Sequence, residues 1–389
     1  MTRICFLFNH DQTHQLAHSL PIALALAARG VHRITLAYAR QSVRAEIERQ
    51  ADPALLARME LVQLRLRSAP ARLLAGALEG LVPATKLLIY RDNLDFFRSF
   101  DAVVVSEKTT LLLKTRYGLD NLKLIHTRHG AGDRAIGFNP ESAKFDLVLV
   151  SGPKIRDRLI ADAGLAPERI ALVGYPKFDL CAHNRFVDTF PAPERPTVLY
   201  NPHPSPKLSS WFRDGAAVLE AFRGQDRYNL IFAPHVMLFE RRWVVTIDPP
   251  SLARVRAPGA EFSGEPRIHI DPGSAASSDM SYTNRADIYL GDVSSQIYEF
   301  LRAPRPCLFL NSHGVDWRGD PNYLHWQAGP VLESAHGLLD AIDAAVASHR
   351  DYAGTQQALI DATFALSGRP SAERAADAIG AFLEGKALG

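Results

Sequence analysis

The chain has 389 residues, of which 47% are hydrophobic and 22% are charged, and 44 basic against 42 acidic residues give a formal net charge of +2. This composition excludes a disordered chain, and the balanced charge argues against nucleic acid as the main partner. The length suits two domains. No run of about 18 apolar residues occurs, so we expect no membrane-spanning helix.

The cellular compartment is indicated by the first residues and by the cysteines. The apolar stretch Arg3–Phe8 is followed at once by Asn9 and His10, which makes it too short for a signal peptide. The cysteines show neither a disulfide framework nor a metal-ligand spacing. We therefore expect a protein of the reducing cytoplasm. The cysteines are Cys5, Cys181 and Cys307.

In the first half, short apolar runs alternate with helical patterns. The series opens with a strand at Ile4–Phe8, a helix at Thr13–Arg29 that ends at Gly30, and a strand at Arg33–Tyr38. Such a β-α-β unit predicts a parallel sheet of Rossmann type. Helical Ala39–Met59 follows. Further strands are expected at Glu60–Leu66, Ala102–Val105, Lys123–His126, Asp146–Val150 and Arg169–Val173.

Polar residues follow several of these strands, and the carboxyl edge of a parallel sheet is where ligands bind. We therefore predict an acceptor-side site at this edge. No G-x-G-x-x-G fingerprint follows the first strand, so a nicotinamide cofactor is disfavoured and no cofactor is expected. The candidates by position are His10, His14, Glu107, Arg128, His129, Gly130, Ser151 and Gly152.

Residues 67–100 form an insertion in which apolar residues are mixed with arginines and a lysine. Such a segment suits a helix lying in a membrane interface, which would place the protein peripherally on the inner face of the plasma membrane. Two helices that pack on the core are the alternative interpretation.

The second half repeats the architecture after a polar, proline-containing stretch that follows Gly174–Asp179. We place an N-terminal domain at 1–185, a C-terminal domain at 186–355 and a helical tail at 356–389 that packs back on the N-terminal domain. Two Rossmann-like domains are expected to face a cleft. Strands are expected at Thr197–Tyr200, Asn229–Phe232, Arg267–Ile270, Asp287–Leu290, Cys307–Leu310 and Pro330–Leu332, and helices at Lys207–Phe222, Ser277–Thr283, Val293–Leu301 and Ala335–His349.

The turn after the strand Asp287–Leu290 is the strongest candidate for chemistry. Gly291 lets the backbone pass close to a ligand, and Asp292 suits the N-cap of the following helix. Ser294 and Ser295 add hydroxyls at the positive end of that helix, which predicts a phosphate-binding loop. An ordinary helix cap is the alternative.

Several short motifs in this order resemble the CDP-glycerol glycerophosphotransferase family, which includes teichoic-acid primases and polymerases. The resemblance covers about residues 120–315 and implies two Rossmann-like domains of the GT-B type. The motifs are His129-Gly130, Phe145-Asp146, Gly174-Tyr-Pro-Lys-Phe-Asp179, Leu199-Tyr200-Asn-Pro202, Ala233-Pro-His235 and Arg285-Ala-Asp-Ile-Tyr-Leu-Gly-Asp-Val-Ser-Ser295.

The resemblance implies roles for individual residues. His129 would be the base that activates the acceptor, and His235 would lie near the donor pyrophosphate. Asp292, Ser294 and Ser295 would form the phosphate loop, with Gly291, Asn201 and His203 beside it. Two departures weaken the assignment of donor and acceptor: His203-Pro204-Ser205 replaces the usual threonine-bearing turn, and Ala-Gly-Asp-Arg follows Gly130.

The chemistry agrees with these roles, because transfer from a CDP donor needs a base and N–H or positive groups on the pyrophosphate. Structural roles for His129, His203 and His235 are the alternative. His10, His14 and His18 have a spacing that suits a metal, but only Asp11 stands beside them, so no metal is expected.

We therefore expect a transferase that moves glycerophosphate from CDP-glycerol to a hydroxyl of a lipid-linked or glycan acceptor. Two alternatives are a nucleotide-sugar glycosyltransferase of the GT-B fold and a non-catalytic nucleotide-binding protein of envelope assembly. Sugar epimerases share the fold, but no acid-base carboxylates for them can be placed. Catalysis is expected to use helix dipoles and side-chain donors without a metal.

Overall fold

The computed structural model describes residues 1–10, 13–78, 84–187, 190–247 and 250–388. The backbone forms two compact units. The first comprises Met1–His129, Phe138–Leu180 and Thr363–Gly389, and the second comprises Gly130–Gly137 and Cys181–Ala362. The boundary thus differs from the expected one in two ways: it lies at Leu180, and the segment Gly130–Gly137 leaves the first unit for the second.

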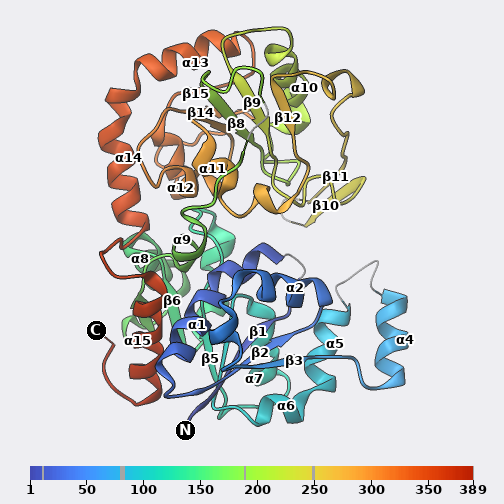
Figure 1. The fold of residues 1–389 in the computed structure, drawn as a ribbon, viewed down its shortest axis with the longest axis vertical. Helices are drawn as coiled ribbons and strands as arrows, with labels where there is room; N and C mark the ends of the chain where they lie inside the picture. The colour runs from blue at the N-terminus through green and yellow to red at the C-terminus, as the bar shows by residue number, and fades with distance from the viewer. Residues whose placement is uncertain (11–12, 79–83, 188–189, 248–249, 389) are drawn as a thin grey trace. The chain divides into compact units, whose positions relative to one another are not determined.

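The first unit is built on a seven-stranded parallel sheet of order β3-β2-β1-β4-β5-β6-β7 (Figure 1). This is the strand order of a Rossmann-type sheet, which is reversed between β1 and β4. Most strands are short apolar runs that are buried on both faces, whereas the edge strand β3 is only partly buried. The strands are β1 Arg3–Phe8, β2 Arg33–Tyr38, β3 Glu60–Gln63, β4 Ala102–Val105, β5 Lys123–His126, β6 Leu147–Val150 and β7 Ile170–Leu172.

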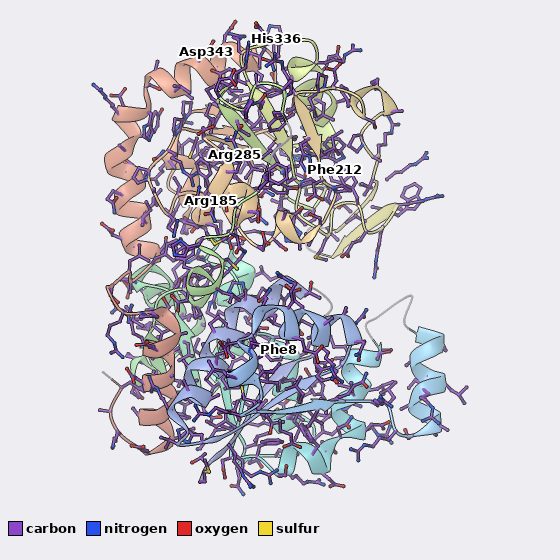
Figure 2. The ribbon with its side chains drawn as sticks, viewed as in Figure 1. Phe8, Arg185, Phe212, Arg285, His336 and Asp343 are labelled. Atoms are coloured by element: carbon purple, nitrogen blue, oxygen red, sulfur yellow. The ribbon has the colours of Figure 1, made fainter. Side chains whose placement is uncertain are left out.

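Helices cover both faces of this sheet. Phe8 belongs to the core on one face (Figure 2), where α1 and α15 lie side by side. The other face packs against α5–α8. The helices are α1 Leu20–Arg29, α2 Gln41–Gln50, α3 Pro53–Leu56, α4 Ala69–Leu78, α5 Ala84–Asp92, α6 Leu94–Arg98, α7 Leu112–Thr115, α8 Pro153–Ala163, α9 Pro176–Cys181 and α15 Ser371–Leu383, with 3₁₀ turns η1 Thr13–His18, η2 Lys108–Leu111, η3 Ala135–Phe138, η4 Pro140–Lys144 and η5 Pro167–Arg169.

The second unit repeats the design with a six-stranded parallel sheet of order β12-β9-β8-β13-β14-β15. An antiparallel hairpin, β10–β11, was not predicted from the sequence. The strands are β8 Thr197–Asn201, β9 Asn229–Phe232, β10 Trp243–Ile247, β11 Pro250–Arg254, β12 Ile268–Ile270, β13 Ile288–Gly291, β14 Cys307–Leu310 and β15 Val331–Leu332; the helices are α10 Trp211–Phe222, α11 Ser281–Arg285, α12 Gln296–Phe300, α13 Leu338–Ala347 and α14 His349–Thr363, with η6 Ala260–Phe262, η7 Ala275–Ser277 and η8 Pro321–Ala328.

The predicted fold class, α/β with two Rossmann-like domains, is confirmed by these two sheets. The helical tail differs from the expectation of one helix. It breaks between α14 and α15, where Gly368 and Pro370 interrupt the helical pattern, and α15 lies in the first unit.

The insertion at 67–100 is helical. Residues 79–83, which join its first two helices, lie outside the described residues. α4 stands at the edge of the first unit beside α5 (Figure 1), and it buries Ala71 and Ala75. α5, in contrast, buries Ile89 and Tyr90 in the core. The core-packing interpretation therefore describes α5, while α4 exposes Leu73 and Leu74.

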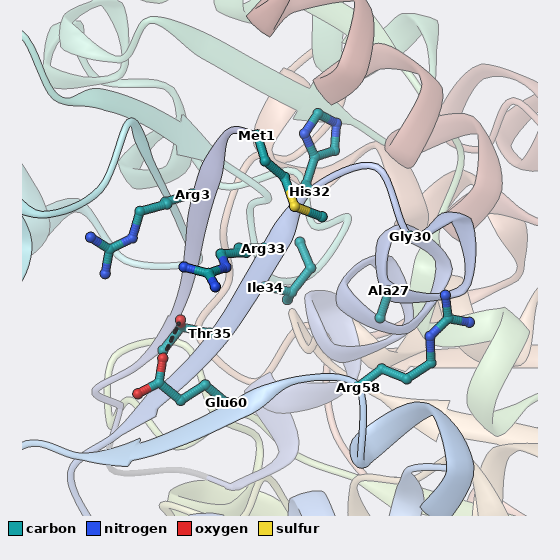
Figure 3. A pocket seen from close by; sticks show the side chains of 10 residues that line it. All are labelled: Met1, Arg3, Ala27, Gly30, His32, Arg33, Ile34, Thr35, Arg58 and Glu60. Atoms are coloured by element: carbon teal, nitrogen blue, oxygen red, sulfur yellow. Dashed lines mark hydrogen bonds between the residues drawn. The ribbon is translucent and has the colours of Figure 1, made fainter.

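A pocket of about 490 Å³ opens at the amino ends of β1, β2 and β3, at the opposite edge of the sheet from the predicted site (Figure 3). Arg3, Arg33 and Arg58 line it together with His32 and Glu60.

Candidate functional site

The predicted donor-binding residues meet at one point of the second sheet. The strand order reverses between β8 and β13, and ligands of open α/β sheets bind outside the carboxyl ends of strands at such a reversal. Asn201 ends β8 and Gly291 ends β13, in register with each other. His203 and Asp292–Ser295 lie in the loops that leave these two strands.

Asp292 does not cap the helix that follows it, because α12 begins only at Gln296, with Ser295 at the N-cap. Its carboxylate turns inward and accepts hydrogen bonds from His203 N at 2.9 Å, Ser210 N at 2.6 Å and Ser210 Oγ at 2.8 Å. Burial raises the pKa of Asp292 to about 6, against the opposing effect of these donors. Asp292 therefore holds the loop after β8 against the loop after β13.

Asn201 and Ser294 are also used inside the protein. Ser294 Oγ donates to Asn201 Oδ1 at 2.5 Å, and Asn201 Nδ2 donates to Ala233 O at 2.6 Å. These two hydrogen bonds connect Ala233, two residues before His235, through Asn201 to Ser294 of the predicted phosphate loop. Gly291 serves packing rather than ligand approach, because a Cβ there would lie 2.5 Å from the Tyr289 ring.

Ser295, in contrast, is exposed. We therefore expect the two serines to respond differently to substitution. Ser295→Ala should weaken binding of a nucleoside diphosphate without changing the melting temperature. Ser294→Ala should lower the unfolding free energy by about 1 kcal/mol, because Asn201 loses its buried donor. Titration calorimetry and urea denaturation of both variants measure these effects, and a Ser295→Ala protein with unchanged affinity would contradict the expectation.

The segment Gly130–Gly137 completes this region, although the sequence placed Gly130 in the acceptor domain. Gly130 and Gly132 lie against Ser295, and a Cβ on Gly132 would lie 2.9 Å from Ser295 Cβ. Gly130 also has a φ of +77°, which favours glycine. The residues Ala-Gly-Asp-Arg that follow Gly130 differ from the family motif. They are thus the stretch that packs against the start of α12.

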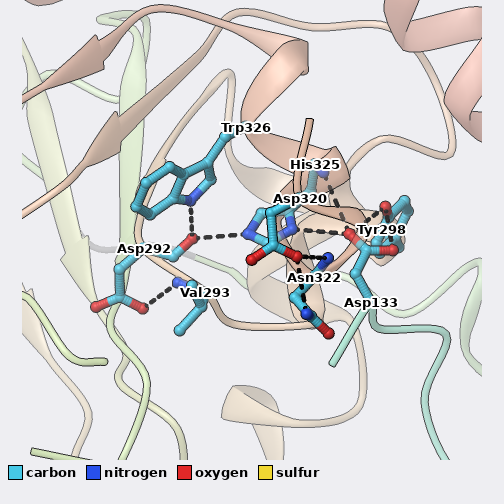
Figure 4. Close-up of polar contacts among 8 residues, drawn as sticks. All are labelled: Asp133, Asp292, Val293, Tyr298, Asp320, Asn322, His325 and Trp326. Carbon is cyan, nitrogen blue, oxygen red and sulfur yellow. Dashed lines mark hydrogen bonds and ion pairs between the residues drawn. The ribbon is translucent and has the colours of Figure 1, made fainter. Parts of the chain in front are cut away.

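Asp133 anchors the segment through a buried network (Figure 4). Its carboxylate accepts from Tyr298 OH at 2.6 Å and lies 2.9 Å from His325 Nδ1. His325 Nε2 in turn lies 3.0 Å from Asp292 O, which also accepts from Trp326 Nε1 at 2.8 Å. Both nitrogens of His325 therefore lie within hydrogen-bond distance of an oxygen atom.

Arg134 is placed by this anchor next to His203, with Arg134 Nη1 3.3 Å from His203 Nε2. Ser205 N donates to His203 Nδ1 at 3.0 Å. His203 is thus approached by two N–H donors, but neutral imidazole has only one acceptor nitrogen. One of the two contacts therefore brings donor against donor, and an oxyanion between Arg134 and His203 would accept hydrogen bonds from both.

His203 is kept neutral by its surroundings. Burial holds the pKa of His203 well below its ordinary range, and the positive charge of Arg134 and the neighbouring His235 act in the same direction. The rings of His203 and His235 have centroids 6.3 Å apart. Met237 N donates to His235 Nδ1 at 3.3 Å, which leaves Nε2 as the ring nitrogen that can carry a proton. Arg134, His203 and His235 can therefore donate N–H hydrogen bonds to an anion.

In the first unit, the predicted base His129 follows β5. His129 Nδ1 lies 2.9 Å from the carbonyl oxygen of Ser106 and donates to it, which leaves Nε2 with the lone pair. Desolvation lowers the pKa of His129, against the opposing effects of the bond to Ser106 and the charge of Glu107, and the residue is exposed. An unprotonated imidazole of fixed tautomer is suited to accept a proton.

The other acceptor-side candidates have different surroundings. His10 is buried, with its ring edge-on to Phe8 at a centroid distance of 6.0 Å. His14 lies in η1, and its side chain is outside the described residues, as is Asp11. Arg128 lies over the Phe138 ring at 4.8 Å, and burial lowers its pKa to about 10. Glu107 forms a salt bridge with Lys86.

Comparison with solved structures identifies the fold. The chain is similar to a variant of the wall teichoic acid polymerase TagF soaked with CDPG, at a TM-score of 0.62 and 15% identity over 99% of this chain and 89% of that one. A putative UDP-N-acetylglucosamine 2-epimerase from Listeria monocytogenes matches at a TM-score of 0.60 and 14% identity over 100% and 98% of the two chains. The chain has the GT-B fold.

The S. aureus MnaA–UDP structure matches equally, at a TM-score of 0.60 and 13% identity over 99% of this chain and 97% of that one. No protein-family model matches the sequence, and no curated protein does. In the part of the chain that the structure describes, no helix has both the length and the apolar character needed to cross a membrane.

Proposed function

We propose that the protein transfers a glycerophosphate unit from CDP-glycerol to a hydroxyl of a lipid-linked or glycan acceptor. The observation that carries this proposal is the pair of facing donors, Arg134 and His203, at the strand reversal of the second unit. Two neighbours with the same fold support a nucleotide donor, since one was soaked with CDPG and another was solved with UDP.

The reaction assigns a task to each group. The acceptor oxygen attacks the β-phosphorus of the donor, the bond from that phosphorus to the bridging oxygen breaks, and CMP leaves. Within the first unit, His129 is suited to accept the proton of the acceptor hydroxyl, because its bond to the Ser106 carbonyl leaves the lone pair on Nε2. Arg134, His203 and His235 stabilise the charge that develops on the leaving phosphate. No cofactor takes part in this scheme.

A nucleotide-sugar transferase is the second candidate, because the UDP-containing neighbour has the same fold. The diphosphate site would serve either donor. The nucleotide that is released, CMP or UDP, separates the two proposals.

Proton uptake on donor binding tests the site. His203 is neutral in the free protein because its pKa is depressed, and a bound diphosphate would raise that pKa. Binding then takes up a proton, so affinity for CDP-glycerol should increase as pH falls below neutrality. Titration calorimetry in buffers of different ionisation enthalpy measures the uptake.

His203→Asn should remove the proton uptake, since asparagine keeps an acceptor for Ser205 N but does not titrate. His336→Ala, at an exposed histidine of the same unit, should bind as wild type does (Figure 2). Equal uptake in the wild type and in His203→Asn would remove His203 from the donor site.

Peripheral membrane contact is proposed for α4 alone. Leu73 and Leu74 are 76% and 46% exposed, and Arg72 lies beside them, whereas Leu87 and Leu88 are half-buried. Apolar side chains flanked by arginine suit an anionic membrane surface. We expect Leu73→Glu with Leu74→Glu to abolish co-sedimentation with anionic vesicles without loss of stability. Leu366→Glu, at another exposed leucine, is the control; release by both variants would contradict the assignment.

A further inference from the structure

Another pocket, of about 370 Å³, lies at the amino edge of the second sheet. Three segments of the second unit line it: the linker before β8, the last turn of α11, and the turn between α12 and β14. Arg285 and Arg305 precede β13 and β14, whereas Gly291 and Asp292 lie at the carboxyl end of β13. The pocket is therefore separate from the residues of the proposed transfer reaction.

The three segments are bonded to one another, so the side chains that line the pocket meet at one place. Asn284 Nδ2 and Arg302 Nη2 both donate to the carbonyl oxygen of Ala182, each at 3.3 Å. Arg305 Nη1 donates to Ala286 O at 2.7 Å, directly after α11. α11 and α12 also pack against each other, so the turns that follow them lie on the same face of the second sheet.

Four arginines line this pocket, and no carboxylate among the described residues does. Arg185 and Arg285 belong to the linker and to α11 (Figure 2). Arg285 forms an ion pair with Asp287 at 3.4 Å. The other three arginines form no ion pair with a carboxylate of the described residues, so their positive charges are not neutralised by direct contact. They are Arg185, Arg302 and Arg305.

Arg305 is held in a fixed position at the base of this cluster. Its guanidinium lies over the Phe300 ring at 3.8 Å and also donates to the Phe300 carbonyl oxygen. Burial lowers the pKa of Arg305 to about 10, with Asp287 acting in the opposite direction, so the side chain stays charged at neutral pH. An anion in the pocket would offset the cost of burying this charge.

Arg185 and Arg302 supply the accessible N–H donors. Both residues are exposed. The Arg185 guanidinium makes no hydrogen bond within the described residues, and Arg302 uses only Nη2, for the bond to Ala182. Arginine is well matched to phosphate, because its planar fork donates two parallel hydrogen bonds to neighbouring oxygens.

Two asparagines add acceptors to this set of donors. Asn184 Nδ2 donates to Asp279 O and Asn284 Nδ2 donates to Asn184 O, each at 2.9 Å, so both amide nitrogens are used inside the protein. Neither amide oxygen accepts a hydrogen bond from the described residues, and both residues line the pocket. The two oxygens can therefore accept hydrogen bonds from hydroxyl groups of a ligand.

We propose that this pocket binds a phosphomonoester that carries hydroxyl groups, with the phosphate on Arg185 and Arg302 and the hydroxyl groups on Asn184 and Asn284. The volume of about 370 Å³ falls in the range of small-molecule sites. A neutral polyol would leave the arginine charges uncompensated, and inorganic phosphate would leave the amide oxygens without donors. A ligand that has both kinds of group matches the whole lining.

Titration calorimetry on the full chain with glucose 6-phosphate, inorganic phosphate and glucose tests the proposal. We expect glucose 6-phosphate to bind most tightly and glucose not to bind. Arg185→Gln with Arg302→Gln should weaken glucose 6-phosphate binding about tenfold or more, because charge-assisted bonds to the phosphate are lost. Arg350→Gln, at an exposed arginine of the same unit outside the pocket, should bind as the wild type does. Arg134→Gln should also do so, which separates this pocket from the predicted donor site.

Arg185→Gln alone keeps the proposal testable if the double variant is unstable, since the Arg185 guanidinium bonds to no described residue. It should keep the melting temperature of the wild type and weaken binding about threefold or more. Vesicles that contain phosphatidylinositol 4-phosphate, tested in the Leu73→Glu and Leu74→Glu background, identify the source of the phosphate. Binding to the vesicles but not to glucose 6-phosphate would assign the phosphomonoester to a lipid headgroup. Binding to neither, or equal binding by the wild type and by both arginine variants, would overturn the proposal.

Discussion

Replacement of His129 by alanine is expected to slow transfer from CDP-glycerol by about 10²–10⁴-fold and to leave donor affinity unchanged. The imidazole donates from Nδ1 to the Ser106 carbonyl, and its lowered pKa keeps Nε2 unprotonated at neutral pH. A base acts only in the chemical step, so its loss changes turnover alone. Steady-state rates of CMP release, with titration calorimetry of the donor, measure both quantities.

His235→Ala provides the contrast. His235 belongs to the unit that carries the facing donors Arg134 and His203, and its contact with the diphosphate would exist before and during transfer. Its loss should therefore lower turnover and also weaken donor binding. Two purely kinetic defects of equal size would contradict this division of tasks, and full activity of His129→Ala would contradict the mechanism.

Replacement of Asp133 by alanine is expected to cost about 3–5 kcal/mol of unfolding free energy in the second unit. The carboxylate is buried and accepts from Tyr298 OH and His325, so its removal leaves buried donors without an acceptor. The four tryptophans of the chain all belong to the second unit, and their fluorescence during urea denaturation reports this unit specifically.

Asp340→Ala is the matched control, because Asp340 forms an exposed ion pair with Arg227 at 3.1 Å. Such a pair contributes at most about 1 kcal/mol. The loss of unfolding free energy in Asp133→Asn should lie between those of Asp133→Ala and Asp340→Ala, since the asparagine amide keeps one acceptor oxygen. An Asp133→Ala protein that unfolds at the same urea concentration as the Asp340→Ala protein would show that the network does not stabilise the unit.

Strands were predicted more accurately than helix starts, and the reason is physical. The strands of a parallel sheet are short apolar runs bounded by polar turns, so β2, β4, β5, β9 and β14 have the predicted bounds. The helix expected at Val293 begins at Gln296, because Val293 N donates to the adjacent Asp292 carboxylate and Ser294 makes a tertiary hydrogen bond to Asn201. The helix expected at Lys207 begins at Trp211, after Ser209 and Ser210 have entered similar bonds.

The candidate site was predictable only where a residue directly follows a strand. His129, His203 and His235 have this property, and their positions follow from the order of the strands. Asp133 and Arg134 were missed as site residues, since they belong to a segment that leaves one unit for the other. His325 and Trp326 reach the phosphate loop from η8, and no local pattern connects His325 to Asp133, which lies 192 residues earlier in the sequence.

The central claim is that the Arg134–His203 pair binds the diphosphate of CDP-glycerol for transfer. The most direct test is to incubate the purified protein with CDP-glycerol, UDP-linked sugars and a hydroxyl acceptor, and to measure the released nucleotide in the wild type and in Arg134→Gln. We predict CMP release from CDP-glycerol by the wild type and at least about tenfold weaker donor binding by Arg134→Gln. Release of UDP alone, of no nucleotide, or of CMP with unchanged donor affinity in Arg134→Gln would contradict the account.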